Sequence, residues 1–169
     1  MLETRGFNLL MAFVCYQLFI TALYFQYVEN MAPCPLCIFQ RVGVIALGLI
    51  FICKAWHAPL IGSRWLPTYS TLALIVALVG SLVAGRHVYI KNLPPNEVPA
   101  CGPSLAYLRD MLPFNEVISV VLAGDGECAK GSWQMLGVSM PGWVLIFFIT
   151  VILLCGWNIY RHFKPRSLF

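Results

Sequence analysis

Charged residues are scarce in this chain of 169 residues, because lysine, arginine, aspartate and glutamate together supply 11% while hydrophobic residues supply 60%. This composition excludes an ordinary soluble globular protein and indicates a membrane protein. The formal net charge is only +4 and the basic residues form no stripe, which excludes a typical nucleic-acid-binding surface. The sequence also has no internal repeat and no low-complexity tract, so a repeat protein is not predicted.

Four apolar runs are long enough to cross a membrane, since each span needs about 20 residues for about 30 Å of hydrocarbon. They lie at about residues 7–28, 36–56, 68–90 and 142–160. The pattern predicts an all-α membrane protein, an antiparallel four-helix transmembrane bundle forming a single integral membrane domain over residues 1–169. The first run is too long for a cleaved signal peptide and three more follow it, so we expect it to be retained.

The connecting segments at about residues 29–35 and 91–141 fall on one side of the membrane. Five basic residues lie on that side and six on the other, so their number alone decides little. The length of segment 91–141 favours translocation, because long loops cross largely regardless of charge. We therefore expect both termini inside, with these inner basic residues: Arg5, Lys54, Arg64, Arg161, Lys164 and Arg166.

The seven cysteines divide by their predicted position. Three lie within or at the inner ends of spans, where free cysteine packs as a small hydrophobic side chain: Cys15, Cys53 and Cys155. Four lie on the outer side, where disulfides persist: Cys34, Cys37, Cys101 and Cys128. The outer four are the candidate reactive residues.

Cys34 and Cys37 form a Cys-x-x-Cys pair, which can hold or release two electrons by closing and opening a disulfide. Pro35 suits the first turn of a helix, so Cys37 should lie where the helix dipole stabilises a thiolate. Arg41 follows Cys37 by four residues on the same helix face, and we interpret it as a second stabiliser of that thiolate. The alternative for Arg41 is an anchor at the membrane edge. His87 at the outer end of the third run is, taken alone, an interface residue.

The long outer segment 91–141 contains more than linker. Residues 93–99 are proline-rich and should be extended. Residues 113–122 space their apolar side chains as a short amphipathic helix does. We expect this helix either to lie on the membrane or to pack on the mouth of the bundle.

Other interpretations of the four outer cysteines compete with a reactive dithiol. Four cysteines can bind zinc, but a second close pair of cysteines is lacking, so we predict no metal. A static Cys101–Cys128 bridge would close a 28-residue loop and contribute about 3.6 kcal/mol in the chain-entropy model. A disulfide-stabilised membrane scaffold or small transporter is the alternative function, although the span interiors hold almost none of the polar groups that a transporter needs.

Four segments, in this order, resemble the DsbB (disulfide bond formation protein B) family. They are residues 33–41 (PCPLCIFQR), the segment around Cys101, residues 124–129 (GDGECA) and residues 133–143 (WQMLGVSMPGW). The resemblance covers nearly the whole chain. It implies a protein-disulfide:quinone oxidoreductase of the bacterial inner membrane, with cytoplasmic termini and periplasmic redox segments, which reoxidises a periplasmic DsbA-like thiol oxidase.

The resemblance also implies a route for the electrons. A partner thiolate attacks Cys101 of a Cys101–Cys128 disulfide, and a transient Cys34–Cys128 bond passes the electrons to the Cys34/Cys37 pair. Cys37 then donates them to a quinone, either ubiquinone or menaquinone. Two further residues match the family's quinone site: Arg41 and His87.

Overall fold

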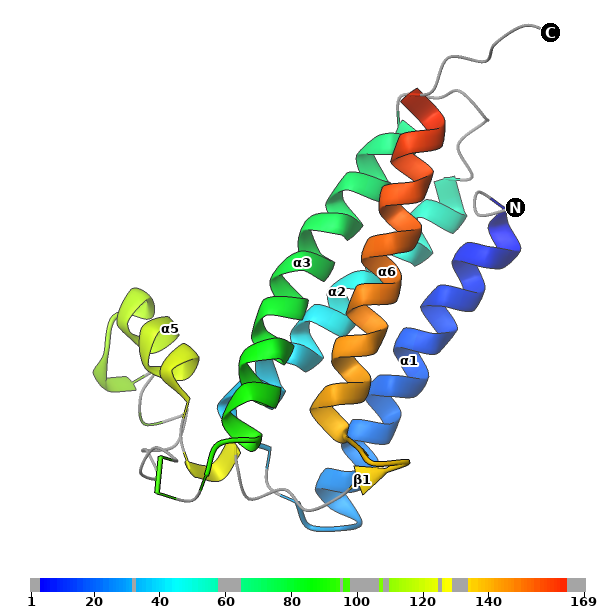
Figure 1. Cartoon of the computed structure of the whole chain (residues 1–169). Helices are drawn as coiled ribbons and strands as arrows, with labels where there is room; N and C mark the ends of the chain where they lie inside the picture. The colour runs from blue at the N-terminus through cyan, green and yellow to red at the C-terminus, as the bar shows by residue number, and fades with distance from the viewer. Residues whose placement is uncertain are drawn as a thin grey trace, which may run out of the picture.

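A computed structural model describes residues 4–31, 33–57, 65–94, 96–97, 107, 110–124, 126–128 and 134–163. Four long helices dominate it: α1 (Arg5–Tyr27), α2 (Pro35–His57), α3 (Trp65–Lys91) and α6 (Met140–Phe163). Consecutive long helices run in opposite directions, so α1 begins and α6 ends at the same end of the bundle (Figure 1). We call this the Lys54 end and the opposite one the Cys34 end. The predicted fold class is confirmed, and each predicted span lies within a few residues of its helix.

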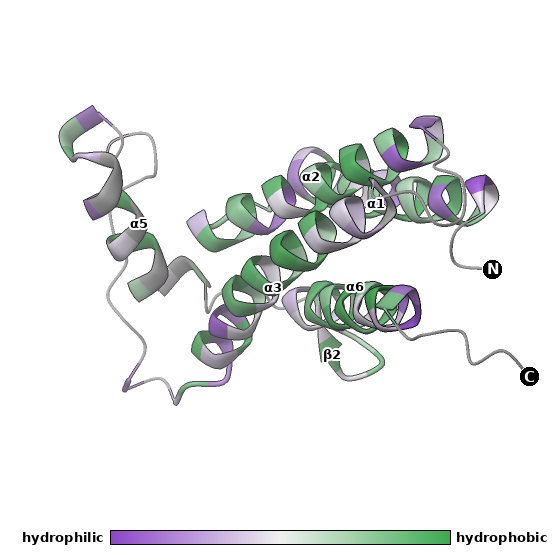
Figure 2. Ribbon diagram, turned by 90° about the horizontal axis from the view of Figure 1, so that it is seen from above, coloured by the Kyte–Doolittle hydropathy of each residue, from purple (hydrophilic) through white to green (hydrophobic). Residues whose placement is uncertain are grey.

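All four helices are long and apolar enough to cross a membrane. Figure 2 shows hydrophobic residues along most of each helix and hydrophilic residues mainly near the ends. Large apolar side chains point outward from every helix, among them Phe13 (56% exposed), Val42 (60%), Leu82 (74%) and Leu153 (67%). Helices satisfy their own backbone hydrogen bonds, so such a surface suits hydrocarbon rather than water. The chain is a multi-pass membrane protein.

Small residues let the helices approach closely at the centre of the bundle. The ring of Phe148 is fully buried, and a Cβ built on Gly80 would lie only 2.5 Å from it. On Gly48 a Cβ would lie 3.3 Å from Cys15, which brings α1 onto α2. Helix α1 packs on α2, α2 on α3 and α3 on α6, whereas α1 and α6 make little direct contact. The backbones of the first and last helices are therefore farther apart than those of the other neighbours, although side chains of both belong to the buried core.

The Lys54 end buries polar side chains, contrary to the expectation that the spans hold almost none. Lys54 Nζ donates to Ser70 Oγ at 3.1 Å, and Asn158 Nδ2 donates to the same oxygen at 3.3 Å. Lys54, one of the basic residues expected on the inner side, lies in the last turn of α2 and is only 3% exposed. Asn8, 2% exposed, adds a fourth polar side chain. Interhelical hydrogen bonds of this kind hold membrane helices together.

The short helix of the long outer segment is α5 (Phe114–Ala123), close to its predicted bounds. Val117 and Val121 are buried in a cluster with residues from the Cys34 ends of α2 and α3. Arg86 Nη2 on α3 donates to the carbonyl oxygen of Ala123 at 3.0 Å. Helix α5 therefore packs on the Cys34 ends of α2 and α3, as the second alternative expects, and its position on a membrane stays a prediction. Its C-cap, Gly124, has φ 81° and a Cβ there would lie 2.2 Å from Ile90, so glycine is required.

A small hairpin leads into α6 and was not predicted. Strand β1 (Gln134–Met135) pairs antiparallel with β2 (Val138–Ser139). The two turn residues, Leu136 and Gly137, have φ of 56° and 78°, as a type I′ turn requires. Trp143 Nε1 donates to the carbonyl oxygen of Met135 at 3.3 Å, which ties the hairpin to the first turn of α6.

Candidate active site

The Cys34/Cys37 pair is placed by the N-terminus of α2. Pro35 is the first residue of the helix, as predicted, so Cys34 precedes it and Cys37 lies in the first turn. The Cys37 backbone N–H donates to Cys34 Sγ at 3.4 Å, which places this sulfur where a helix cap lies. The two Sγ atoms are 3.1 Å apart. A modest rotation of the side chains would bring them to the roughly 2.05 Å of a disulfide.

A third sulfur reaches this pair from a distant part of the chain. Cys128 lies in the single 3₁₀ turn η1 (Gly126–Cys128) and is 2% exposed. Its Sγ lies within 4.8 Å of the Sγ of Cys34, which is 5% exposed. Hydrogen bonds to Cys128 and Cys37, together with burial, raise the pKa of the Cys34 thiol. The arrangement brings Cys128 within reach of the outer sulfur of the pair, whereas Cys101 lies outside the described residues.

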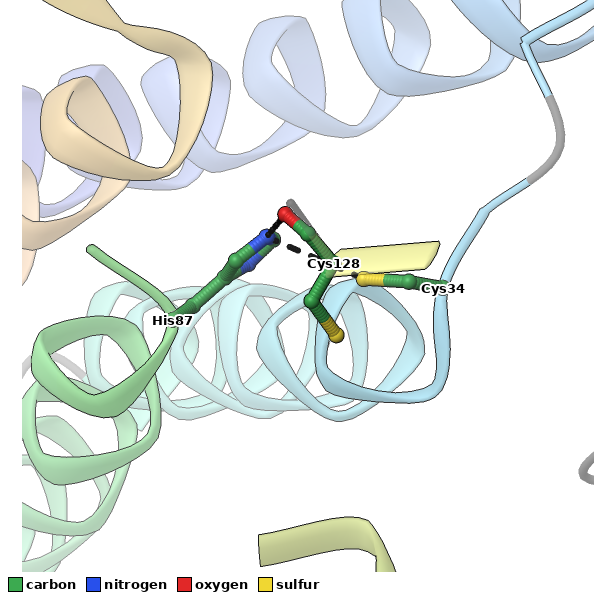
Figure 3. A group of neighbouring side chains, drawn as sticks. All are labelled: Cys34, His87 and Cys128. Atoms are coloured by element: carbon green, nitrogen blue, oxygen red, sulfur yellow. Dashed lines mark hydrogen bonds between the residues drawn. The ribbon is translucent and has the colours of Figure 1, made fainter. Parts of the chain in front are cut away.

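His87 lies beside the sulfurs of Cys34 and Cys37, near the end of α3, and is 4% exposed. Its Nε2 is 3.8 Å from Cys34 Sγ and 3.3 Å from the carbonyl oxygen of Cys128, as Figure 3 shows. Its Nδ1 is 3.9 Å from Cys37 Sγ and 3.1 Å from Gln40 Nε2. Taken alone, the sequence indicated an interface residue, and the family resemblance implied a quinone-site histidine; the structure places His87 in contact with Cys34, Cys37 and Cys128.

The side chain of Arg41 contacts the neighbouring helix α1. Its guanidinium donates through Nη1 to Gln26 Oε1 and through Nη2 to the carbonyl oxygen of Ala22 at 3.0 Å, both on α1. These bonds hold the guanidinium against α1, and the interpretation that Arg41 stabilises a Cys37 thiolate stays a prediction. His87 and Cys34 are the side chains hydrogen-bonded to the Cys37 sulfur.

A cavity of about 520 Å³ adjoins the cysteines, within the usual range for ligand pockets. Its walls come mainly from α1, α2 and α6 and are predominantly apolar, as in Leu18, Phe25, Met140 and Val144. A few groups add sulfur, charge or hydrogen bonds to the wall: Cys34, Cys37, Gln40, Arg41, His87, Lys91 and Cys128. A mostly apolar cavity with a dithiol and a few polar groups in its wall suits a lipid-soluble compound.

Sequence reasoning missed three contributors to this site. Gln40 is 5% exposed, and a glutamine within an apolar run is a signal, because a polar side chain there needs a partner. Gln26 accepts a hydrogen bond from Arg41. Gln26 also lies within an apolar run, so its need for a polar partner is the same signal. Met135 lines the cavity from the hairpin, and no local pattern in the sequence indicates that contact.

The cluster also bears on the metal alternative. Donor atoms of Cys34, His87 and Cys128 all lie within 4.8 Å of one another. Thiolate and imidazole are the ligands that zinc prefers, and Cys37 offers a fourth. The lack of a second close cysteine pair in the sequence is therefore not decisive, because the fold supplies a histidine from another helix.

The chain is similar to known proteins along nearly its whole length. The family model described as "Disulfide bond formation protein DsbB" matches residues 4–158. Among curated relatives, disulfide bond formation protein B of Nitrosococcus oceani is 40% identical over 95% of this chain and 94% of its own. The proteins of that name from Methylococcus capsulatus and Acinetobacter baumannii are 45% and 44% identical, over 87% and 84% of this chain and 90% and 82% of theirs.

Proposed function

This chain belongs to the DsbB family, whose members act in disulfide bond formation in a membrane, and we propose that it oxidises a DsbA-like thiol oxidase at the expense of a quinone. The observation that carries this proposal is that the sulfurs of Cys128 and Cys34 lie within 4.8 Å of each other, at the wall of an apolar cavity. It supports an exchange between two disulfides, one facing a protein partner and one facing the membrane. We also propose that residues 1–169 form a single domain and that the protein lies in the bacterial inner membrane. Its termini would then be cytoplasmic and the Cys34 end would face the periplasm.

The exchange begins with the partner's dithiol. One partner thiolate attacks Cys101 of the proposed Cys101–Cys128 disulfide, forming a mixed disulfide and releasing the Cys128 thiolate. Cys128 attacks Cys34, so a Cys34–Cys128 bond forms, the Cys34–Cys37 bond breaks, and Cys37 leaves as a thiolate. The second partner thiolate displaces Cys101, which releases the oxidised partner. Cys101 then attacks Cys128, restoring the first disulfide and leaving the Cys34/Cys37 pair reduced by two electrons.

The residues around the cavity fit the oxidant. A quinone bound there would accept two electrons and two protons and so return the Cys34/Cys37 pair to its disulfide. Cys37 offers its sulfur from the first turn of α2, where the helix dipole favours negative charge. We propose that Arg41 supplies hydrogen-bond donors to a ring oxygen, that His87 lies against the bound ring in the wall of the cavity, and that the apolar walls hold the isoprenoid chain. Arg41 is already fixed by α1, so little ordering is needed on binding.

The test is quinone-dependent oxidation of a reduced DsbA-like protein by the purified chain. We expect turnover with added quinone and a mixed disulfide that contains Cys101 when the reaction is trapped. Turnover that persists in Cys101→Ser, or a mixed disulfide at Cys128 with none at Cys101, contradicts the proposed order of transfer. Absence of turnover with both ubiquinone and menaquinone contradicts the function itself.

A metal site is the second candidate, favoured by the Cys34, His87 and Cys128 cluster. Its test is the zinc content of the protein purified under reducing conditions. About one equivalent of zinc, lost in His87→Ala and accompanied by no quinone-dependent turnover, would favour the metal site. Turnover without bound metal would favour the redox function.

A further inference from the structure

His87 bridges three elements at the Cys34 end of the bundle. From α3, its Nδ1 lies 3.1 Å from Nε2 of Gln40 on α2, and its Nε2 lies 3.3 Å from the carbonyl oxygen of Cys128 in η1. Gln40 is 5% exposed and His87 4% exposed, so bulk water does not compete for these contacts. The imidazole therefore connects the helix that carries the dithiol with the turn that carries Cys128.

Both contacts require the same tautomer of the imidazole ring. The amide nitrogen of Gln40 only donates, so Nδ1 of His87 must accept. The carbonyl oxygen of Cys128 only accepts, so Nε2 of His87 must donate. A neutral imidazole has one N–H and one bare nitrogen, and here the N–H belongs on Nε2.

We propose that Gln40 is a positioning residue that holds His87 in the Nε2–H tautomer and thereby fixes Cys128 beside Cys34. In the other tautomer a bare nitrogen would face the Cys128 carbonyl and that contact would be lost, whereas Gln40 would keep its contact only by turning its amide so that Oε1 accepts from Nδ1–H. Cys34 Sγ lies 3.8 Å from the same Nε2, so the N–H that holds Cys128 also faces the sulfur with which Cys128 exchanges. The inference rests on the proposed function for its purpose, because the placement matters when these two sulfurs exchange.

The first experiment reads the tautomer directly. Nitrogen-15 NMR of full-length protein labelled at histidine distinguishes N–H on Nε2 from N–H on Nδ1, with His87→Gln used to assign the signals. We expect Nε2–H in the unchanged protein, a mixture of tautomers in Gln40→Leu, and a protonated Nδ1 in Gln40→Glu, whose carboxylate only accepts. Signals unchanged from the parent in both variants would overturn the proposal.

The second experiment measures the placement of Cys128. In full-length protein carrying Cys37→Ala, Cys53→Ala and Cys101→Ala, two thiols of the site remain, and oxidised glutathione converts them to a Cys34–Cys128 disulfide with release of two reduced glutathiones. The equilibrium constant of this exchange with glutathione gives the effective concentration of the Cys128 thiol at Cys34. We expect Gln40→Leu to lower it about tenfold, the usual factor for one lost hydrogen bond.

Gln17→Leu is the matched control, because Gln17 is an exposed glutamine of α1 outside the cavity. It should leave the effective concentration unchanged. Equal values in Gln40→Leu and Gln17→Leu, with folded helical protein in both, would overturn the positioning role while leaving the proposed function intact. Failure of the Cys34–Cys128 disulfide to form even with Gln40 present would instead contradict the proposed exchange. If Gln40→Leu does not fold, the NMR spectrum of Gln40→Glu decides.

Discussion

The two ends of the bundle both bury polar side chains, but they use them differently. At the Lys54 end, Lys54 and Asn158 both bond to Ser70, around a cavity of only about 10 Å³. At the Cys34 end, His87 and Gln40 also bond to each other, but sulfurs surround them and a cavity of about 520 Å³ lies beside them. Buried polar groups that pack against one another with almost no cavity stabilise the fold. Buried polar groups beside a large cavity can also interact with a ligand.

This difference predicts that substitutions at the two ends affect different properties of the protein. Those at the Cys34 end should change turnover more than the free energy of unfolding. Those at the Lys54 end should do the reverse. Each of the following variants tests one side of that contrast.

The largest effect on turnover is expected for Cys37→Ser. A serine hydroxyl cannot form the disulfide, so quinone-dependent oxidation of the partner should fall by about a thousandfold or more. The free energy of unfolding should change by less than about 1 kcal/mol, because Cys37 is only partly buried. Turnover assays and thermal unfolding in the same detergent measure both.

Cys15→Ser is the matched control, since Cys15 is 2% exposed within the core of the bundle. It places a hydroxyl among apolar side chains and should destabilise the fold by about 1–3 kcal/mol. Turnover of the folded protein should stay within about twofold of the parent. A large loss of turnover in Cys15→Ser would contradict the claim that substitutions in the core affect stability and not turnover.

Arg41→Ala should raise the quinone KM ten- to a hundredfold, the range for a lost hydrogen bond to a charged group. Arg41→Lys should lie between the alanine variant and the parent, because lysine keeps the charge but loses the planar fork of donors. The KM for the protein partner should not change in either. If the quinone KM is also unchanged in Arg41→Ala, Arg41 only ties α2 to α1, as its bonds to Gln26 and Ala22 allow.

Lys54→Ala should lower the free energy of unfolding by about 1–2 kcal/mol, because the packed stem and the bond to Ser70 are both lost. Turnover of the folded fraction should be unchanged. Lys91→Ala is its counterpart at the Cys34 end, where Lys91 lines the cavity and is partly exposed. It should alter the quinone KM while the unfolding midpoint stays constant. The opposite pattern would show that the two ends are not specialised.

Cys53→Ala should have the smallest effect. Cys53 is exposed on the outer face of α2, contrary to the expectation that it packs as a small apolar residue. We expect the free energy of unfolding to change by less than about 0.5 kcal/mol and turnover to remain constant. A loss of turnover would indicate that this face of α2 contributes to the site.

The sequence predicted the elements well where the signal is local. Hydropathy located the four long helices, apolar spacing located α5, and Pro35 marked the first residue of α2. These features depend on residues close together in the chain.

The site itself depends on contacts that local spacing does not determine. Arg41 shares a helix face with Cys37, yet Gln26 and Ala22 on another helix decide where its guanidinium lies. His87 and Gln40 are 47 residues apart in the chain, and nothing in their spacing predicts their contact. The buried Lys54 was missed for the same reason, because its partner Ser70 is on α3. In each case the deciding partner belongs to another helix.

The sparse contact between α1 and α6 has a consequence for how activity is quantified. Both helices line the large cavity, so a ligand entering between them would come sideways out of the hydrocarbon. Its relevant concentration is then a mole fraction among lipids, not an amount per volume of water. Adding lipid or detergent at constant quinone should dilute the substrate and raise the apparent KM in proportion. The KM for such a ligand can be compared between preparations only when the ligand concentration is given as a mole fraction of the lipid and detergent.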